Sequence, residues 1–331
     1  MKINRRAALA LAFATLLAGT TGAMAADFNL RIHTLVKSPH PYNDMADHLK
    51  KALEEGSGGK IAVTIFDSGQ LGQDPAVIGE VALGTIDLIV SSASNIAGEV
   101  PELSIFTMPY LFANMDQVVE KVGPGTMGHD HFAAAFDDRI PGVKLLAIGA
   151  SGTRNMSSVT TAINSPADLT GLRMRTTQSP MDANTWSALG MLPVTVAWGE
   201  LYAAMQTGVA DAMESSLPGY TGSKLYEVAP NLALTGHQVQ INYIAVAQRS
   251  WDKMDGDLQT LMQKVANEAN LLGVEKAKEY DSELVETLKA EHGVTVTMPD
   301  QSAFVAVLEP IQAELAQSLD LEAEYTLLKG K

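Results

Sequence analysis

The sequence predicts an α/β fold built as two lobes, because strand-like and helix-like segments alternate along it and the alternation starts twice. In the first series, a helix pattern at 42–55 separates strand-like runs at 29–35 and 60–66. A helix at 75–83 and a strand at 86–90 continue this series. The second series supplies strands at 143–148, 172–176 and 194–196.

A long amphipathic helix is predicted in the carboxyl-terminal third. There is no proline between Pro230 and Pro299, and apolar residues recur every three or four positions from Leu258 to Leu288. A helix of this length is expected to kink, and Gly273 is the expected position of the bend.

Residues 1–25 have the pattern of a secretory signal: three basic residues, an apolar run from 7 to 19, and Ala23-Met24-Ala25 before a cleavage point. The residues around Arg5-Arg6 match the twin-arginine pattern poorly, which favours the Sec route. Removal of this leader leaves 306 residues, enough for two lobes. We therefore expect an exported protein.

Charge and cysteine content exclude several classes of function. After loss of the leader, 20 basic side chains stand against 38 acidic ones, which argues against nucleic acid or an anionic lipid surface as partner. The chain has no cysteine, so disulfides and thiol nucleophiles are excluded. The stability of the fold must come from its core.

Arg175 is the first candidate for binding an anion. Leu172 and Met174 alternate with Arg173 and Arg175, which places Arg175 near the carboxyl end of a short strand. Open α/β sheets bind ligands at that end. A guanidinium pairs with a carboxylate through two parallel bonds and keeps its charge at physiological pH. Arg154 follows the strand-like KLLAIGA and is expected at a second strand end.

Several phrases, taken in order, resemble the substrate-binding proteins of TRAP transporters, the tripartite ATP-independent periplasmic importers of organic acids (DctP family). They are EEGSGGKIAVTIFDSGQLGQD, EVALGTIDLIV, VPELSIFTMPYLF, SGTRNMSS, and GLRMRT with LGMLPVTVAWGELYAAMQTGVADAMESS. The resemblance runs from about Phe28 to the carboxyl terminus.

The resemblance implies a periplasmic-binding-protein-like fold and a receptor function. It places lobe I at 26–150 plus 241–280 and lobe II at 151–240 plus 281–331, with the long helix bracing both. It also implies a periplasmic receptor of a Gram-negative bacterium, without cofactor or enzymatic activity, that delivers a small organic anion to the TRAP permease membrane subunits. Such a protein can be a monomer or a dimer.

The resemblance also implies a set of ligand-binding residues in the cleft. Arg175 would grip the carboxylate, Arg154 would assist, and Trp198, just before a helix, would cover an apolar part of the ligand. Ser215 stands where many relatives have asparagine, a departure that leaves the substrate class open. Glu214 is expected to orient Arg175, and Tyr220 to close one wall or to pack. The other candidates are Thr34, Ser38, His40 and Ser92, with Asp74, His237 and Gln240 as weaker choices.

Patterns typical of other functions are weak in this sequence. Residues 123–128 fit GxGxxG, but they follow a helical pattern and contain Pro124, so they predict a loop and no dinucleotide site. His129 and His131 lack further metal-ligand partners and are expected in a solvated loop. An exported lyase or isomerase and a ligand-presenting subunit of a sensor kinase remain the rival functions. Sugar acids, C4-dicarboxylates, keto or hydroxy acids and sulfonates all suit an arginine clamp.

Overall fold

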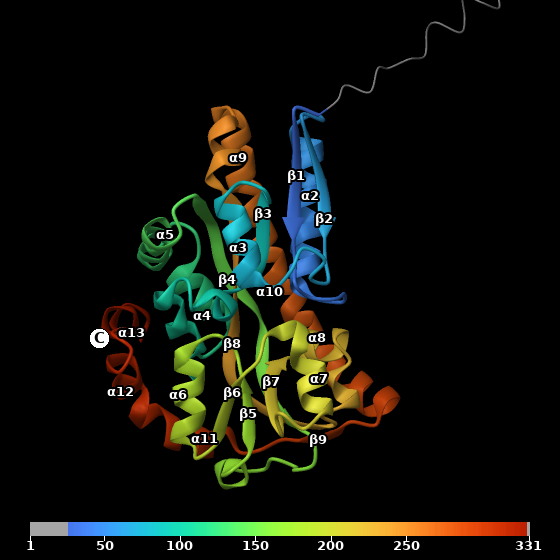
Figure 1. Ribbon diagram of the computed structural model, residues 1–331, viewed down its shortest axis with the longest axis vertical. Helices are drawn as coiled ribbons and strands as arrows, with labels where there is room; N and C mark the ends of the chain where they lie inside the picture. Colours follow the sequence, from blue (N-terminus) through green and yellow to red (C-terminus); the bar gives the residue numbers. More distant parts are fainter. Residues whose placement is uncertain (1–25, 330–331) are drawn as a thin grey trace, which may run out of the picture.

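The computed structural model describes residues 26–329, so the predicted leader at 1–25 lies outside the described residues. Its centre is one mixed sheet in the order β2-β1-β3-β8-β4-β7-β5-β6, with β9 on β8 (Figure 1). The strands are β1 (Phe28–His33), β2 (Ile61–Phe66), β3 (Leu88–Ser92), β4 (Val143–Ser158), β5 (Arg173–Thr176), β6 (Leu192–Thr195), β7 (Ala212–Ser216), β8 (Asn231–Ala247) and β9 (Thr295–Thr297).

The antiparallel pair β4 and β8 runs through both halves of the sheet. One half adds β3, β1 and β2 to β8, and the other adds β7, β5 and β6 to β4. Register shifts interrupt the pair between Leu145 and Ala147, between Ala150 and Thr153, and between Arg154 and Met156. Gly152, with φ +128, lets the chain pass the irregularity between Ala150 and Thr153 and continue as a strand.

This continuation corrects one prediction. Arg154 was expected after a strand ending near residue 148, but β4 extends to Ser158 and holds Arg154 in its interior. The alternation of the sequence is interrupted at the irregularity, which conceals the second half of the strand.

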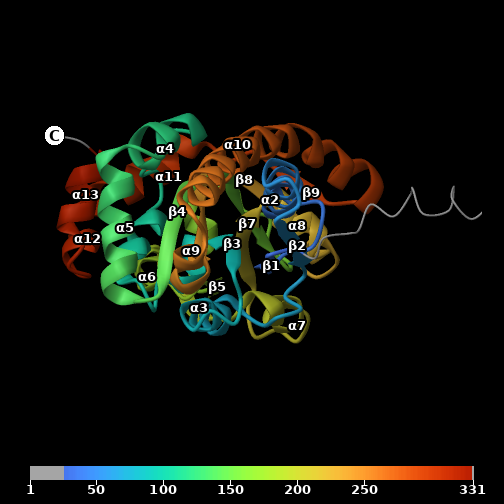
Figure 2. The ribbon, with the colours of Figure 1, turned by 90° about the horizontal axis from the view of Figure 1, so that it is seen from above.

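The helices cover both faces of the sheet, as Figures 1 and 2 show. They are α2 (Pro41–Gly56), α3 (Asp74–Ala82), α4 (Met115–Val122), α5 (Met127–Arg139), α6 (Pro180–Ala188), α7 (Leu201–Gln206), α8 (Leu217–Gly222), α9 (Gln248–Lys253), α10 (Gly256–His292), α11 (Gln301–Leu308), α12 (Gln312–Gln317) and α13 (Glu322–Lys329). Short 3-10 helices include η1 (Ala93–Ile96), η2 (Pro101–Thr107) and η4 (Trp198–Glu200).

The predicted long helix is α10, which Figure 2 shows as a continuous arch over the sheet. It starts at Asp255, whose carboxylate accepts from the Leu258 N–H, and stops at Gly293 with φ +65. It packs against α2, β4 and α8. Gly273 allows the close approach to α2, because a Cβ there would come within 2.7 Å of the Met45 sulfur.

Separate apolar clusters fill the two halves. One packs α2 and α10 on the β1–β3 side, and another packs α7, α8 and the end of α10 on the β7 side. Leu315 of α12, Leu328 of α13 and Leu321 between these helices join a cluster with α4, α5 and η2. The exact lobe boundaries stay a prediction.

The expected loop at His129 and His131 is wrong, because both residues lie in the first turns of α5, which begins after the Thr126 cap. His131 Nε2 contacts Glu324 of α13 at 2.7 Å, whereas His129 Nε2 lies 3.3 Å from the Leu146 carbonyl. The two rings therefore have separate partners. Within residues 26–329, no group of three or more metal-ligating side chains comes together, and no helix is long and apolar enough to span a membrane.

Candidate functional site

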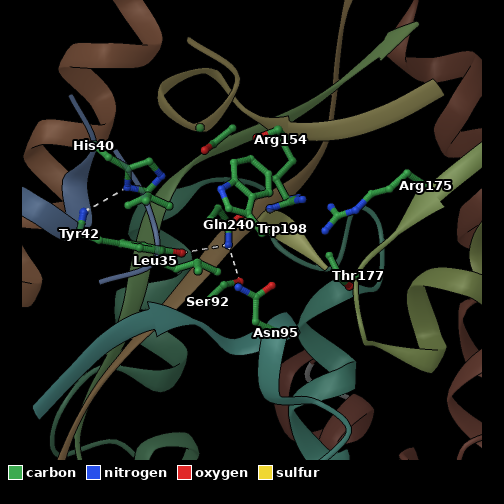
Figure 3. A pocket seen from close by; sticks show the side chains of 14 residues that line it. Leu35, His40, Tyr42, Ser92, Asn95, Arg154, Arg175, Thr177, Trp198 and Gln240 are labelled. Atoms are coloured by element: carbon green, nitrogen blue, oxygen red, sulfur yellow. Dashed lines mark hydrogen bonds between the residues drawn. The ribbon is translucent and has the colours of Figure 1, made fainter. Parts of the chain in front are cut away.

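A cavity lies between the two halves of the sheet (Figure 3). One wall comes from the β1 and β3 ends and the opposite wall from β4, β5, β7 and their following turns, with β8 between them. Its lining is Leu35, Val36, His40, Tyr42, Ser92, Asn95, Arg154, Arg175, Thr177, Trp198, Ser215, Ser216, Gly219 and Gln240.

Arg175 is fully buried at the carboxyl end of β5, as the strand pattern predicts. Its Nε donates to the Val196 carbonyl at 2.9 Å, while neither terminal nitrogen has a hydrogen-bond partner among residues 26–329. Figure 3 shows this guanidinium directed toward the side of the cavity where Trp198 and Thr177 lie. The Trp198 ring centre is 5.8 Å from the guanidinium carbon.

Burial lowers the pKa of Arg175 to about 10, opposed by nearby Glu214 and assisted by the positive charge of Arg154. The guanidinium therefore stays charged at neutral pH. Burying a cation with two donors that form no hydrogen bond is unfavourable in free energy. An anion that accepts from both nitrogens would remove that cost.

Arg154 and Glu214 form a buried ion pair between the adjacent strands β4 and β7. Nε and one terminal nitrogen of Arg154 donate to the two carboxylate oxygens, and the same nitrogen reaches the Glu214 carbonyl at 3.2 Å. Burial raises the pKa of Glu214, but the charge and hydrogen bonds of Arg154, together with nearby His237, outweigh it and hold the pKa well below its usual range. The expectation that Glu214 orients Arg175 by contact is wrong, since both Glu214 oxygens face Arg154.

The turn after Arg175 is fixed by Asp182 of α6. Its carboxylate accepts from the Thr177 backbone N–H at 2.8 Å, the Thr177 hydroxyl at 3.0 Å and the Trp186 indole at 2.6 Å. Thr177 is thereby held at the edge of the cavity. Burial raises the pKa of Asp182.

The opposite wall is built from neutral polar groups. His40 caps α2 by accepting from the Tyr42 N–H at 3.2 Å through Nδ1, which leaves Nε2 to carry the proton. Burial, with a smaller contribution from Arg154, lowers the pKa of His40 to about 3, so its ring is neutral. Gln240 on β8 donates through Nε2 to the Tyr42 hydroxyl at 3.1 Å and to Ser92 Oγ at 2.6 Å.

Seven of the predicted site residues line this one cavity: Arg175, Arg154, Trp198, Ser215, His40, Ser92 and Gln240. Five others have structural partners outside its lining. Thr34 and Ser38 hold the Asn43 side chain. Tyr220 packs in the apolar core and donates to the Ala229 carbonyl at 2.7 Å. His237 contacts Thr235, and Asp74 lies behind the first wall.

Sequence reasoning missed Tyr42, Asn95 and Thr177. Thr177 follows Arg175 by two positions, and Asn95 follows Ser92 by three, so each extends a segment already suspected. Tyr42 gave no such signal, because its place in a helix pattern marks it as core. Its hydroxyl reaches the cavity only because α2 begins beside β8.

Comparisons with known proteins agree with this architecture. The family model for bacterial extracellular solute-binding proteins, family 7 (DctP), matches residues 32–318. A solute-binding protein of Verminephrobacter eiseniae is 30% identical, the match covering 88% of this chain and 85% of the relative. The chain therefore belongs to the DctP family of TRAP transport solute-binding proteins, which is a periplasmic family.

Named relatives and solved structures extend this result. The 2,3-diketo-L-gulonate-binding periplasmic protein of Escherichia coli is 27% identical, with 91% of this chain and 90% of the relative covered. A TRAP solute-binding protein of Bordetella bronchispeptica, with density interpreted as pantoate, superposes with a TM-score of 0.84 at 28% identity, covering 92% and 100% of the two chains. A TRAP solute-binding protein from Polaromonas, bound to D-erythronate, superposes with a TM-score of 0.83 at 25% identity. The match covers 92% of this chain and 100% of that protein.

Proposed function

We propose that this protein is a periplasmic receptor that captures a small organic acid in the cavity between its two halves and delivers it to the membrane subunits of a TRAP permease. The family assignment supports transport, and the cavity supports an anionic ligand. The ligand is carried unchanged, without a cofactor.

The observation that carries the proposal is the state of Arg175. It is fully buried and charged, and its two terminal nitrogens have no partner in the part of the chain that the structure describes. Because Glu214 is engaged by Arg154, these nitrogens are the natural position for a carboxylate held through two bonds. Trp198 would then shield the pair from water.

The remaining lining residues are proposed to contact the body of the ligand. Ser215, Ser92 and the His40 Nε2–H offer short polar contacts for hydroxyl groups, and Leu35 and Val36 an apolar surface. D-Erythronate and 2,3-diketo-L-gulonate, which relatives bind, and pantoate, as which the density in another relative was interpreted, each combine one carboxylate with hydroxyl groups. This chemistry is consistent with the cavity described above.

Arg175→Ala tests the proposal. A thermal-shift screen of organic acids that includes D-erythronate and pantoate first identifies the acid that stabilises the wild-type protein most, since a bound ligand raises apparent stability. Calorimetry should then show that Arg175→Ala weakens its binding by about 2 to 5 kcal/mol. Arg175→Lys should restore only part of the affinity, because an ammonium group lacks the planar pair of donors of a guanidinium.

Arg173→Ala is the matched control, since Arg173 lies two positions earlier on β5 and pairs with Asp211 on the exposed side. It should bind as the wild type does. Unchanged affinity in Arg175→Ala would refute this mode of binding.

A further inference from the structure

The amide of Asn95, at the edge of the cavity, has a fixed orientation. Its Nδ2 donates to the Asp74 carboxylate at 2.6 Å. Asp74 is fully buried and also receives the Ser91 hydroxyl and His33 Nε2, the latter at 3.1 Å. A carboxylate that collects three donors acts as an acceptor, so the amide nitrogen must face it. The Asn95 oxygen is then turned away from Asp74.

That oxygen faces the ligand space. Asn95 lines the cavity and is only half-buried, and Figure 3 shows its oxygen on the side where Thr177 and Arg175 lie. Gln240 adds a second acceptor of the same kind. Its nitrogen donates to Tyr42 and Ser92, while its Oε1 is buried with no hydrogen-bond partner among the described residues. Asn95 and Gln240 therefore each keep an amide oxygen able to accept a hydrogen bond.

The charges around the cavity suit a single negative charge on the ligand. Arg154 is neutralised by Glu214, and the His40 ring is neutral, which leaves Arg175 as the available cation among the lining residues. Asp74 lies directly behind Asn95 and Asp182 behind Thr177. A second carboxylate on the ligand would contact acceptor oxygens that have a buried carboxylate close by. The repulsion between these negative groups would lower the affinity for such a ligand.

We infer that the cavity selects monocarboxylates that carry a hydroxyl group at the end away from the carboxylate, and that Asn95, oriented by Asp74, discriminates against dicarboxylates. This inference rests on the proposed function and narrows it. The hydroxyl donates to the Asn95 oxygen, whereas a carboxylate in the same place has no proton to donate.

Matched pairs of acids test the inference. D-Erythronate and meso-tartrate differ only in a terminal CH₂OH or carboxylate, as do D-galactonate and galactarate. One of the two pairs, the four-carbon or the six-carbon acids, will bind more tightly. Within that pair, calorimetry should show at least tenfold higher affinity for the monocarboxylate than for the dicarboxylate. Asn95→Ala should reduce this ratio at least threefold. Asn184→Ala, at a similarly half-buried asparagine outside the cavity lining, should leave it unchanged.

A second variant covers the case in which Asn95→Ala fails to fold. Asp74→Asn keeps the shape of the side chain but lets it donate, so Asn95 is free to turn its NH₂ toward the ligand, and the ratio should fall again. Equal affinity for both members of a pair, or a ratio unchanged in the variants, would overturn the inference.

The two proposals fail in different ways. If both acids of a pair bind equally and Arg175→Ala abolishes both, the carboxylate clamp stands and only the selectivity is lost. If another acid of the thermal-shift screen binds but none of these four does, only the inference falls. If no acid of the screen binds to the wild-type protein, the proposed function and this inference both fall.

Discussion

Arg154 and Glu214 neutralise each other inside the protein, and this pairing leaves Arg175 without an acidic partner. The three side chains come from the neighbouring strands β4, β7 and β5. Glu214 pairs with only one of the two buried guanidinium groups, so Arg175 keeps its positive charge to offer an anion. The ion pair is therefore as much a part of the binding site as the arginine that contacts the ligand.

Glu214→Gln should destabilise the protein strongly, by about 3 to 5 kcal/mol, because it leaves the Arg154 charge buried without compensation. Urea denaturation measures this loss. The exposed pair of Arg173 and Asp211 is the control, since Asp211→Asn should cost less than about 1 kcal/mol. Similar costs for the two variants would contradict the role assigned to the buried pair.

Gln73→Ala should shorten the lifetime of the complex with the tightest-binding acid. The Gly199 N–H beside Trp198 donates to Gln73 Oε1 at 3.1 Å, which joins the α3 side of the cavity to the η4 side. Loss of one hydrogen bond costs about 0.5 to 1.5 kcal/mol, a dissociation rate roughly 2- to 12-fold faster. Stopped-flow fluorescence follows the dissociation. Gln73→Glu retains the acceptor and should dissociate more slowly than Gln73→Ala; identical rates would argue against the contact.

Trp198→Phe should remove most of the fluorescence change that accompanies binding. Trp198 lies over Arg175 and lines the cavity, whereas Trp186 is a buried residue of α6 and Trp251 lies outside the lining. Trp198→Ala should weaken binding by about 1 to 2 kcal/mol through loss of the cation–π contact and of the cover over the anion. A full fluorescence change in Trp198→Phe would show that another tryptophan reports binding.

Asp281→Asn should change how stability depends on pH. Burial raises the pKa of Asp281 to about 6, against hydrogen bonds from Thr153, whose N–H donates to Oδ2 at 2.9 Å. The folded state therefore binds more protons than the unfolded state between about pH 4 and 6, and this group makes stability fall as pH rises through that range.

The asparagine variant lacks this titration. Its free energy of unfolding relative to the wild type should rise by up to about 2 kcal/mol between pH 4 and pH 7. Denaturation curves at the two pH values measure the change. A difference between the proteins that does not depend on pH would refute the assignment.

The sequence predicted the local elements well where one periodicity held over a whole segment. The βαβ start, the strand with Arg175 and the long helix α10 are all confirmed within a few residues. The prediction failed for β4, because its irregularity near Gly152 interrupts the alternation on which strand prediction depends. The cavity lining was predicted in part, through residues that follow strand ends.

What the sequence by itself determined is the chemistry available: an α/β chain with no cysteine, an excess of acid, and an arginine at a strand end. Only the tertiary structure decided which charges are free. Glu214 is close to both arginines in the sheet. Because β4 lies beside β7, its carboxylate pairs with Arg154 and not with Arg175. The orientation of Asn95 by Asp74 joins residues 21 positions apart. Such pairings depend on distances across strands and helices, which no local pattern of residues contains.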